Sequence, residues 1–584
     1  MNAATTPIND DDVGEEWIYP WPTNFHLSEH YIDDILSLKV CVIGAGLAGI
    51  TAGVMLPAKV PGIELTILEK NGDVGGTWYE NVYPGVRCDV PSTVYQASFS
   101  PNKNWSEQYA QGSEILEYWK SIARKFDVYS MLRLNTKVVA SHWDPSRSQW
   151  RVETTNVTTG EEAVEYFHFL ITAIGHFNEW KLPSYPGMSD FRGVIHHSSA
   201  WDPAFDARGK RIATIGNGAS GIQVTTALQK IAGHIDHYAR NPTWIAGSFN
   251  SALEDRKDEP MPFTPEERRA FENPAEYLKY RKGLEGSFFR GFDGQLKGSE
   301  TSRNAKRKFL ESMKRRLEDG DEELVAKLTP TFPPNCRRLT PGPGYLEALK
   351  AENVRLIQTP IERFTASGIV TTDGIHREVD AVIASTGANV DYAPPFPITA
   401  NGLDLSKDWK PEGKFGFPYS YLGLCTPGFP NLAYILGPNP AGINGTVPHA
   451  VETQVTYMAK MLRKMSSQRI KSMTPSKAAT DDFVEYCDAF FPRTNLSLNC
   501  SSWSNGGRAG NRIHGHWPGS GSHSTRAKAE PRWEDFEYEY ERPENRFAYF
   551  GNGQTRMEND PESDMTPYLS ENPDLRDLLE KWYL

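Results

Sequence analysis

Short apolar runs recur along the chain, and each leads into a turn and then into a longer amphipathic stretch. Residues 40–43 (VCVI) and 212–215 (IATI) are almost continuously apolar and are followed directly by glycine-rich turns. Runs of this length are typical of strands buried on both faces of a parallel sheet. The repeated order of strand, turn and helix therefore predicts an α/β fold assembled from βαβ units.

Further apolar runs extend this pattern. Residues 65–68 and 237–239 have the composition expected of the second strand in each of two units. Residues 169–175 and 381–387 are buried-strand candidates that end at a glycine. We expect each of these two to mark a point where the chain crosses between units.

A charged, helix-forming segment interrupts the alternation between Trp244 and Arg337. Thr264 is followed by proline and, three residues on, by Glu267, which is a typical capped helix start. Residues 306–328 form a second charge-rich helical stretch. We therefore expect a helical insertion here. Three aromatic side chains in it either line a substrate pocket or dock the insertion on the body: Phe288, Phe289 and Phe292.

Both glycine-rich turns have the spacing G-x-G-x-x-G of a dinucleotide-binding loop. The first glycine makes the tight turn, the second lets the backbone approach a pyrophosphate, and the third lets the helix pack on the strand. The helix N-terminus then faces the phosphates. The residues are Gly44, Gly46 and Gly49 in the first loop, and Gly216, Gly218, Ser220 and Gly221 in the second.

The second strands of the two units end in opposite charges. Glu69 stands about 20 residues after the first loop, where a carboxylate accepts hydrogen bonds from a ribose diol. Arg240 holds the matching place in the second unit, where a guanidinium favours a 2′-phosphate. The first site is thus predicted to take FAD or NAD and the second NADPH. A chain with both is most simply a flavoprotein that takes electrons from NADPH.

These features predict two Rossmann-like dinucleotide-binding domains, one for FAD and one for NADPH, with the helical insertion in the NADPH domain. A polar N-terminal extension with aromatic anchors at Trp17, Tyr19, Trp21 and Phe25 is expected to lie over the body. The expected ranges are 1–38 for the extension, 39–200 and 388–584 for the FAD domain, 205–250 and 330–387 for the NADPH domain, and 251–329 for the insertion.

Composition and charge narrow the classes of partner. A chain of 584 residues is expected to form two or three domains. Its net charge of −12 argues against nucleic acid and acidic membrane surfaces as partners. The sequence has neither a long apolar run nor a signal-peptide pattern, so we expect a cytoplasmic protein without a membrane span. The six cysteines include no Cys-x-x-Cys pair; free thiols and no bound metal are expected.

Two longer motifs are more specific than the glycine loops. The first lies between the loops, with the pattern F-x-G-x-x-x-H-x-x-x-W-P/D at Phe191, Gly193, His197 and Trp201. The second has the pattern A/G-G-x-W-x4-F/Y-P-G/M-x3-D and includes Gly76, Thr77, Trp78 and Asp89. Both resemble, at full match, signatures of the Baeyer–Villiger monooxygenases.

Two further segments resemble parts of the same family. Residues 336–342 (CRRLTPG) are similar to its arginine-bearing loop, in a form met in many fungal members. Ser502 and Trp503 resemble the loop that closes over the nicotinamide. The resemblance covers roughly residues 40–555.

The resemblance implies an enzyme in which NADPH reduces FAD and the reduced flavin adds O2. The resulting flavin peroxide must stay anionic to attack a carbonyl carbon. An arginine beside the flavin stabilises that charge because it keeps its proton. By resemblance this is Arg338, held in place by Asp89, while Arg337 would contact the 2′-phosphate of NADPH; which arginine has which role stays open. His197 and Trp201 are expected to be structural, and Trp78 to pack near the flavin.

The implied function is the insertion of oxygen beside a ketone to give an ester or lactone. The substrate is expected to be a bulky or polycyclic ketone, and a monomer is plausible. One alternative is an N- or S-oxygenating flavin monooxygenase, against which the full motif match and the arginine loop argue. Another is a flavoprotein without oxygenase turnover, against which Arg338, Asp89 and Arg240 argue.

Overall fold

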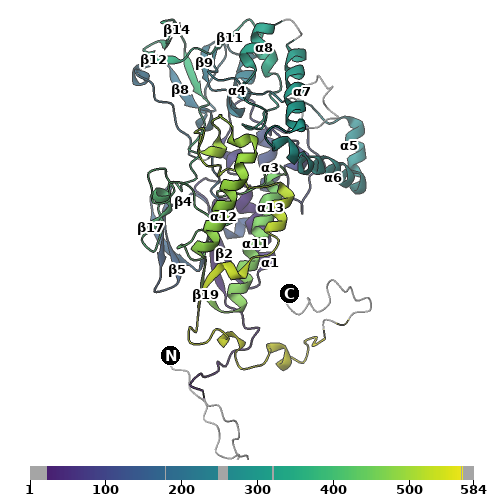
Figure 1. Cartoon of the computed structure of the whole chain (residues 1–584), viewed down its shortest axis with the longest axis vertical. Coiled ribbons are helices and arrows are strands. Elements are labelled where there is room, and N and C mark those ends of the chain that lie inside the picture. Colours follow the sequence, from purple (N-terminus) through teal and green to yellow (C-terminus); the bar gives the residue numbers. More distant parts are fainter. Residues whose placement is uncertain (1–22, 178, 247–260, 318–320, 567–568, 570–584) are drawn as a thin grey trace, which may run out of the picture.

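The protein is described here by a computed structural model that covers residues 23–177, 179–246, 261–317, 321–566 and 569. Two five-stranded sheets of parallel strands form the centres of an upper and a lower body (Figure 1). The predicted α/β class with two dinucleotide-binding units is confirmed.

The first sheet lies in the lower body and has the order β18-β7-β1-β2-β3. Its strands are β1 (Leu38–Ile43), β2 (Ile63–Leu68), β3 (Leu132–Arg133), β7 (Phe169–Thr172) and β18 (Leu432–Tyr434), all parallel to their neighbours. Helices α1 (Leu47–Lys59), α3 (Gly112–Lys125) and α11 (Val447–Ser467) cover it, and α1 packs on both of the others. Because β18 joins this sheet, the chain returns to the first unit after the second one is complete.

The second sheet lies in the upper body and has the order β11-β10-β9-β15-β8. Its strands are β8 (Val194–His197), β9 (Arg211–Ile215), β10 (His234–Tyr238), β11 (Val354–Ile357) and β15 (Ala381–Ala384), and α4 (Ala219–Gln229) and α9 (Tyr345–Leu349) pack beside them. The expected boundary of the first unit at residue 200 is wrong, because β8 pairs with β15 in the second sheet.

The described residues form three further sheets. One combines β4 (Thr136–Asp144), β5 (Gln149–Asn156), β6 (Glu162–Phe167), β16 (Ile398–Ala400) and β17 (Leu403–Asp404). Another contains β12 (Ile361–Thr365), β13 (Gly368–Thr371) and β14 (His376–Glu378). The third pairs β19 (Ile470–Pro475) with β20 (Phe536–Tyr540).

The described part of the insertion contains four α-helices: α5 (Pro265–Glu272), α6 (Pro274–Arg290), α7 (Glu300–Arg316) and α8 (Glu322–Leu328). The predicted start of α5 is confirmed, because Thr264 and Glu267 form a reciprocal capping box. The stretch expected over residues 306–328 falls within two helices, α7 and α8. Residues 251–260 and 318–320 lie outside the described residues. Helices α7 and α8 pack with the second unit through Met313, Leu317 and Val325.

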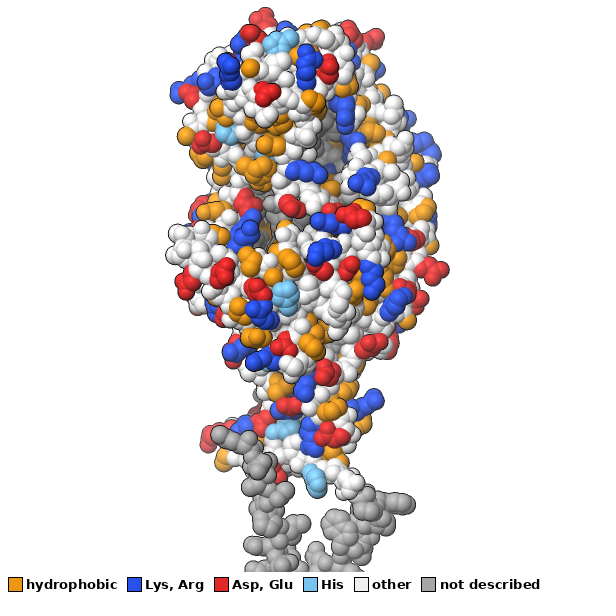
Figure 2. Space-filling model, turned by 90° about the vertical axis from the view of Figure 1, so that its left-hand side faces the viewer, with side chains coloured by type: hydrophobic (Ala, Val, Ile, Leu, Met, Phe, Trp, Pro, Cys, Tyr) orange, Lys and Arg blue, Asp and Glu red, His pale blue; other side chains and the backbone are white. Residues whose placement is uncertain are grey.

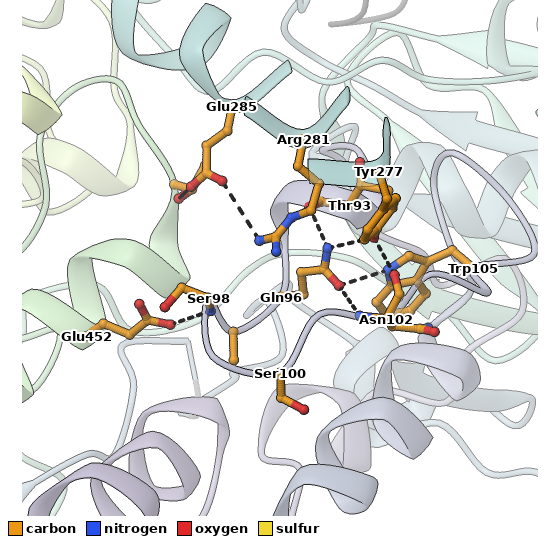
Figure 3. Close-up of polar contacts among 12 residues, drawn as sticks. Thr93, Gln96, Ser98, Ser100, Asn102, Trp105, Tyr277, Arg281, Glu285 and Glu452 are labelled. Carbon is orange, nitrogen blue, oxygen red and sulfur yellow. Dashed lines mark hydrogen bonds and ion pairs between the residues drawn. The ribbon is translucent and has the colours of Figure 1, made fainter. Parts of the chain in front are cut away.

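Helices α5 and α6, in contrast, dock on the first unit through Phe271 and Tyr277, which share its main core. Figure 3 shows the polar side of this contact. The Arg281 guanidinium donates to the Thr93 carbonyl at 3.2 Å, and Gln96 donates to the Tyr277 hydroxyl at 3.0 Å. The insertion therefore joins both units.

Phe288, Phe289 and Phe292 lie in the last turn of α6 and the short helical turn that follows it. The Phe289 ring meets His449 edge to face at 5.4 Å and lies against Gly445 and Gly521, while Phe292 lies 6.4 Å from Phe490. Of the two roles expected for these residues, the contacts are those of docking on the body.

The described part of the N-terminal extension runs along the C-terminal segment. The Arg542 guanidinium lies 4.6 Å from the centre of the Phe25 ring, and the Ile32 amide donates to the Gln554 carbonyl. Trp17, Tyr19 and Trp21 lie outside the described residues. None of the helices in the described ranges has the length and apolar character needed to cross a membrane. On the face shown in Figure 2, acidic and basic side chains are interspersed and the surface is hollowed between the two bodies.

The docking of α6 can be tested at Arg281, which is buried, by Arg281→Met. The substitution keeps an unbranched side chain but removes the charged donor to Thr93, which contributes about 1.5–3 kcal/mol. We expect the urea midpoint to fall and hydrogen exchange to accelerate in α6 (Pro274–Arg290). The exposed neighbour Lys282 provides the control, since Lys282→Met should change stability by less than about 0.5 kcal/mol. Equal exchange in both variants would contradict this account of docking.

Candidate active site

The first glycine loop joins β1 to α1 as the sequence predicts. Gly44 has φ +104°, and a Cβ on Gly49 would lie 1.9 Å from the Gly44 carbonyl oxygen. Gly46 precedes the first turn of α1, and no side chain caps the helix there. The free amide groups of this turn and the missing side chain at Gly46 leave a place where a pyrophosphate fits.

The second glycine loop has the same construction between β9 and α4. A Cβ on Gly221 would lie 1.9 Å from the Gly216 carbonyl oxygen, so the helix packs directly on the turn. At Gly218 a Cβ would meet nothing within 4 Å, and no side chain caps α4. The space in front of Gly218 is therefore suited to a second pyrophosphate.

Gly76, from the second signature motif, lies beside the first loop. A Cβ on Gly76 would lie 2.8 Å from Gly46 Cα. Thr77 and Trp78 follow in the short helix α2 (Thr77–Glu80), where the Trp78 indole packs edge to face on Tyr95 at 5.6 Å. Trp78 is buried and packs in the main core beside this site.

Glu69 directly follows β2, and its side chain reaches the first loop. Its carboxylate accepts hydrogen bonds from the amides of Ala45 at 2.7 Å and Asn71 at 2.9 Å, and the residue is only 4% exposed. Burial raises the pKa of this carboxyl, while the two amide bonds act in the opposite sense. Each oxygen keeps a second lone pair, so the group can also accept from a ribose diol.

Arg338 and Asp89 meet across the junction of the two units, as predicted. Nε of Arg338 lies 2.6 Å from Oδ2 of Asp89, and Nη2 donates to Oδ1 at 2.7 Å. The carboxylate raises the pKa of the guanidinium above its usual range, which keeps it a cation. Arg338 is nevertheless 46% exposed and Asp89 17%, so the cation is available to a ligand.

Arg337 points elsewhere. Its guanidinium lies 5.1 Å from the Phe332 ring and donates through Nη2 to Ser501 Oγ at 3.3 Å. Burial lowers its pKa, and the positive charge of Arg240 lowers it further. Arg240 is exposed and stands two residues after the end of β10. Two guanidinium groups that repel each other are suited to share a dianion such as a phosphate monoester.

Trp503 lies close to the arginine loop. Its ring stacks on His176 at 5.2 Å and lies 4.7 Å from His516. Burial, with Arg338 as the second cause, lowers the pKa of His176 to about 4 and of His516 to about 3. Asn505 completes a capping box that fixes the turn carrying Trp503. Both histidines are therefore neutral rings beside a permanent cation.

This aromatic cluster was not predicted from the sequence. His176 stacks on Tyr392 at 5.3 Å, and Tyr392 meets His514 edge to face at 5.4 Å. His176 follows β7 closely, and residues at the carboxyl ends of parallel strands tend to gather at sites. That position was a usable signal for His176, whereas nothing in the local sequence marks His514 or Tyr392.

A tyrosine from the second signature region connects the two units. The Tyr83 hydroxyl donates to Gln223 Oε1 at 2.8 Å and lies 3.1 Å from Ser220 Oγ, in the first turns of α4. A Cβ on Gly85 would lie 2.7 Å from the Gln223 carbonyl oxygen. The segment that leads to Asp89 is thus fixed against the second nucleotide site.

The first signature motif forms β8 and its flanks, and its contacts are structural. Phe191 packs edge to face on Phe364 at 6.0 Å, and a Cβ on Gly193 would lie 2.4 Å from the Asp380 carbonyl oxygen. His197 stacks on Trp180 at 5.1 Å and accepts from the Ser199 amide. Trp201 packs edge to face on Phe205 at 5.6 Å.

The expectation of free cysteines is wrong for two of the six. Cys336 and Cys500 form a disulfide, whereas Cys41, Cys88, Cys425 and Cys487 are buried and unbonded. The bonded pair is 164 residues apart in sequence, so local spacing gave no sign of it. The two meet because the arginine loop (residues 336–342) lies beside the segment that carries Trp503 (residues 495–505), which we call the tryptophan loop.

The chain is similar to known proteins in both sequence and structure. A family model described as flavin-binding monooxygenase-like matches residues 37–252. The FAD-binding monooxygenase tazF of Aspergillus terreus is 34% identical over 544 residues, which are 91% of this chain and 94% of that protein.

Solved structures are similar over most of the chain. Cyclohexanone monooxygenase from Rhodococcus sp. Phi1 bound to NADP+ has a TM-score of 0.73 at 26% identity, covering 86% of this chain and 99% of that one. Oxidized steroid monooxygenase bound to NADP has a TM-score of 0.71 at 26% identity, covering 86% and 100%.

The second glycine loop allows a matched test of binding against folding. Gly218→Ala places its methyl group in open space, so the free protein should keep its melting temperature. The methyl would occupy the pyrophosphate position, and we expect NADP+ affinity to fall on the order of tenfold or more, about 1.4 kcal/mol. Gly221→Ala should instead destabilise the protein, since backbone must move, at a cost of about 1–3 kcal/mol. Calorimetry and NADP+ titration distinguish them; unchanged affinity in Gly218→Ala would refute the assignment.

Proposed function

The chain belongs to the family of flavin-binding monooxygenases, and on that premise we propose that it inserts one oxygen atom of O2 beside the carbonyl of a ketone. The product is an ester or lactone. The observation that carries this proposal is the Arg338–Asp89 pair, which holds a permanent cation at the junction of the two units. The full match to two Baeyer–Villiger signature motifs supports it.

FAD is proposed to bind in the first unit and NADPH in the second. Three features of the first unit fit an adenine dinucleotide with a free ribose diol. They are the uncapped start of α1, the approach of Gly46 to Gly76 and the carboxylate of Glu69. Arg240 and Arg337 fit the 2′-phosphate that distinguishes NADPH from NADH. The relative named FAD-binding and the neighbours bound to NADP support the choice of these two cofactors.

FAD, when bound, supplies hydride acceptance from NADPH and the activation of O2. The chain itself supplies charge and position. Negative charge that develops on oxygen during attack on a carbonyl carbon is stabilised by a guanidinium, and Arg338 cannot quench that charge by giving up its proton. Asp89 aligns the guanidinium through two parallel contacts and so fixes where the positive charge lies.

The aromatic cluster supplies uncharged rings near Arg338. His176 and His516 carry no charge at neutral pH, so they do not compete with Arg338 for an anion. Together with Trp503 they exclude water from one side of the cation, and a drier environment strengthens its interaction with developing charge. We propose a bulky or polycyclic ketone as the substrate; the similarity to a fungal FAD-binding monooxygenase and to steroid monooxygenase supports that class. A ketone panel with product masses tests it.

Arg338→Ala should keep the fold and bound FAD but lose nearly all ester product. Removal of one group that stabilises a developing anion costs roughly 2.7–4 kcal/mol, about 10²–10³ in rate. Arg338→Lys should recover only part of this, because an ammonium lacks the planar fork that Asp89 orients. The measurement is product formed per NADPH consumed at saturating cofactor.

Arg337→Ala is the matched control for Arg338→Ala. It should raise the NADPH requirement and leave the product yield per NADPH nearly unchanged. The reverse pattern would exchange the roles of the two arginines, and unchanged yield in both variants would contradict the proposed mechanism.

Arg240→Ala should weaken NADPH use and leave NADH use nearly unchanged. A charge-assisted contact to phosphate contributes about 1.5–3 kcal/mol, or roughly 10- to 150-fold in affinity. The measurement is the affinity for NADP+ and for NAD+ by titration, with Arg355→Ala, an exposed arginine of the same sheet, as a control. Equal losses for both nucleotides would refute the assignment of Arg240.

A further inference from the structure

The disulfide Cys336–Cys500 joins two loops that both contribute to the site. Cys336 directly precedes Arg337 and Arg338, and Cys500 lies three residues before Trp503. The bond therefore links the arginine loop of the second unit to a loop in the C-terminal part of the chain. Both cysteines are buried, with exposures of 0% and 3%.

The polar contacts that join the two loops directly are long. Arg337 donates to Ser501 Oγ at 3.3 Å, and Asn495 donates to the Pro334 carbonyl at 3.5 Å. Within the tryptophan loop, Asn505 donates to the Cys500 carbonyl at 2.9 Å, so movement of Cys500 is passed to the turn that carries Trp503. The covalent bond is thus the strongest connection between the two loops.

We propose that Cys336 and Cys500 are a redox-active pair whose oxidation state sets how tightly the enzyme holds NADP+. This inference rests on the proposed function only in placing the NADP+ phosphate at Arg337. In the oxidised protein the bond keeps Arg337 and Trp503 in one arrangement before the nucleotide arrives. Reduction releases the tryptophan loop, and binding must then also order it, which weakens affinity.

The chemistry of the pair balances with a dithiol as reductant. The S–S bond breaks, two thiols form, and the dithiol becomes a disulfide after it has given up two electrons and two protons. Hydrogen peroxide can restore the bond: the two thiols lose their hydrogens, the O–O bond breaks, and two water molecules form. A flavin monooxygenase whose reduced flavin passes two electrons and two protons to O2 without oxygenating a substrate releases this oxidant.

Linkage gives the proposal a test that does not depend on turnover. If the bond strengthens NADP+ binding by some factor, NADP+ must oppose reduction of the bond by the same factor. Burial of both sulfurs also slows reduction of the bond, since a dithiol reaches them only when the loops separate. Saturating NADP+ should therefore raise the dithiol concentration at which half of the disulfide is reduced.

The experiment uses the intact FAD-bound enzyme. Alkylation of denatured, unreduced protein should find four thiols, the free cysteines, and six after reduction, the full set in the sequence. NADP+ affinity, measured by titration, should fall on the order of tenfold in the reduced protein, within the usual range of coupling between sites. Cys336→Ser and Cys500→Ser should each match the reduced enzyme and no longer respond to dithiol.

Cys487→Ser is the control, because Cys487 is a buried free thiol in α12 (Lys477–Phe490) and should leave the redox response intact. Six thiols without reduction would overturn the proposal, as would equal NADP+ affinity in the two oxidation states. If a serine variant does not fold, reduced wild-type enzyme with blocked thiols gives the same comparison. Ester formation is a separate readout, so absence of ester with an intact redox response contradicts only the proposed function.

Discussion

The ion pair between Arg338 and Asp89 is the interaction around which the two nucleotide-binding units are arranged. Its cation comes from the loop before α9 and its anion from the segment after α2, so neither unit contains it alone. The pair has its geometry only when the upper and lower bodies keep one relative position. A guanidinium without this carboxylate would remain charged but would lose its fixed direction, and electrostatic stabilisation depends on that preorganisation.

Several other features maintain that position. Tyr83 and Gly85 fix the segment that leads to Asp89 against the first turns of α4. The insertion bridges the two bodies, since α6 packs on the first and α7 on the second. These contacts are spread over residues far apart in the chain, yet all act on the same junction. The site is thus as much a property of the interface between units as of either sheet.

The sequence was sufficient for those parts of the fold that depend on local pattern. The apolar runs before Gly44 and Gly216, the capped start at Thr264 and the charges at Glu69 and Arg240 each follow from short-range chemistry. Motif resemblance also brought together Arg338 and Asp89, which no periodicity connects. The strand β8 was assigned to the wrong unit, because its partner β15 is distant in sequence and its own composition fits either sheet.

Long-range packing accounts for what could not be predicted. The antiparallel sheet of β4, β5 and β6 carries no motif, and its last strands, β16 and β17, arrive from a different part of the chain. The cluster of His176, Tyr392 and His514 and the bond between Cys336 and Cys500 likewise form only once loops distant in sequence meet. Residue type alone did not separate bonded from free cysteines, since all six are buried.

The two glycine cradles differ in how closely a second backbone segment approaches them. A Cβ on Gly46 would lie 3.5 Å from the Cα of Gly76, because the Gly76 backbone lies against the first loop. A Cβ on Gly218 would meet no atom within 4 Å. The first cradle is thus bounded by backbone from two segments, whereas the position of a Gly218 Cβ lies in open space. For the function proposed above, we expect the first nucleotide to stay over many cycles as a prosthetic group and the second to be exchanged at every turn as a co-substrate.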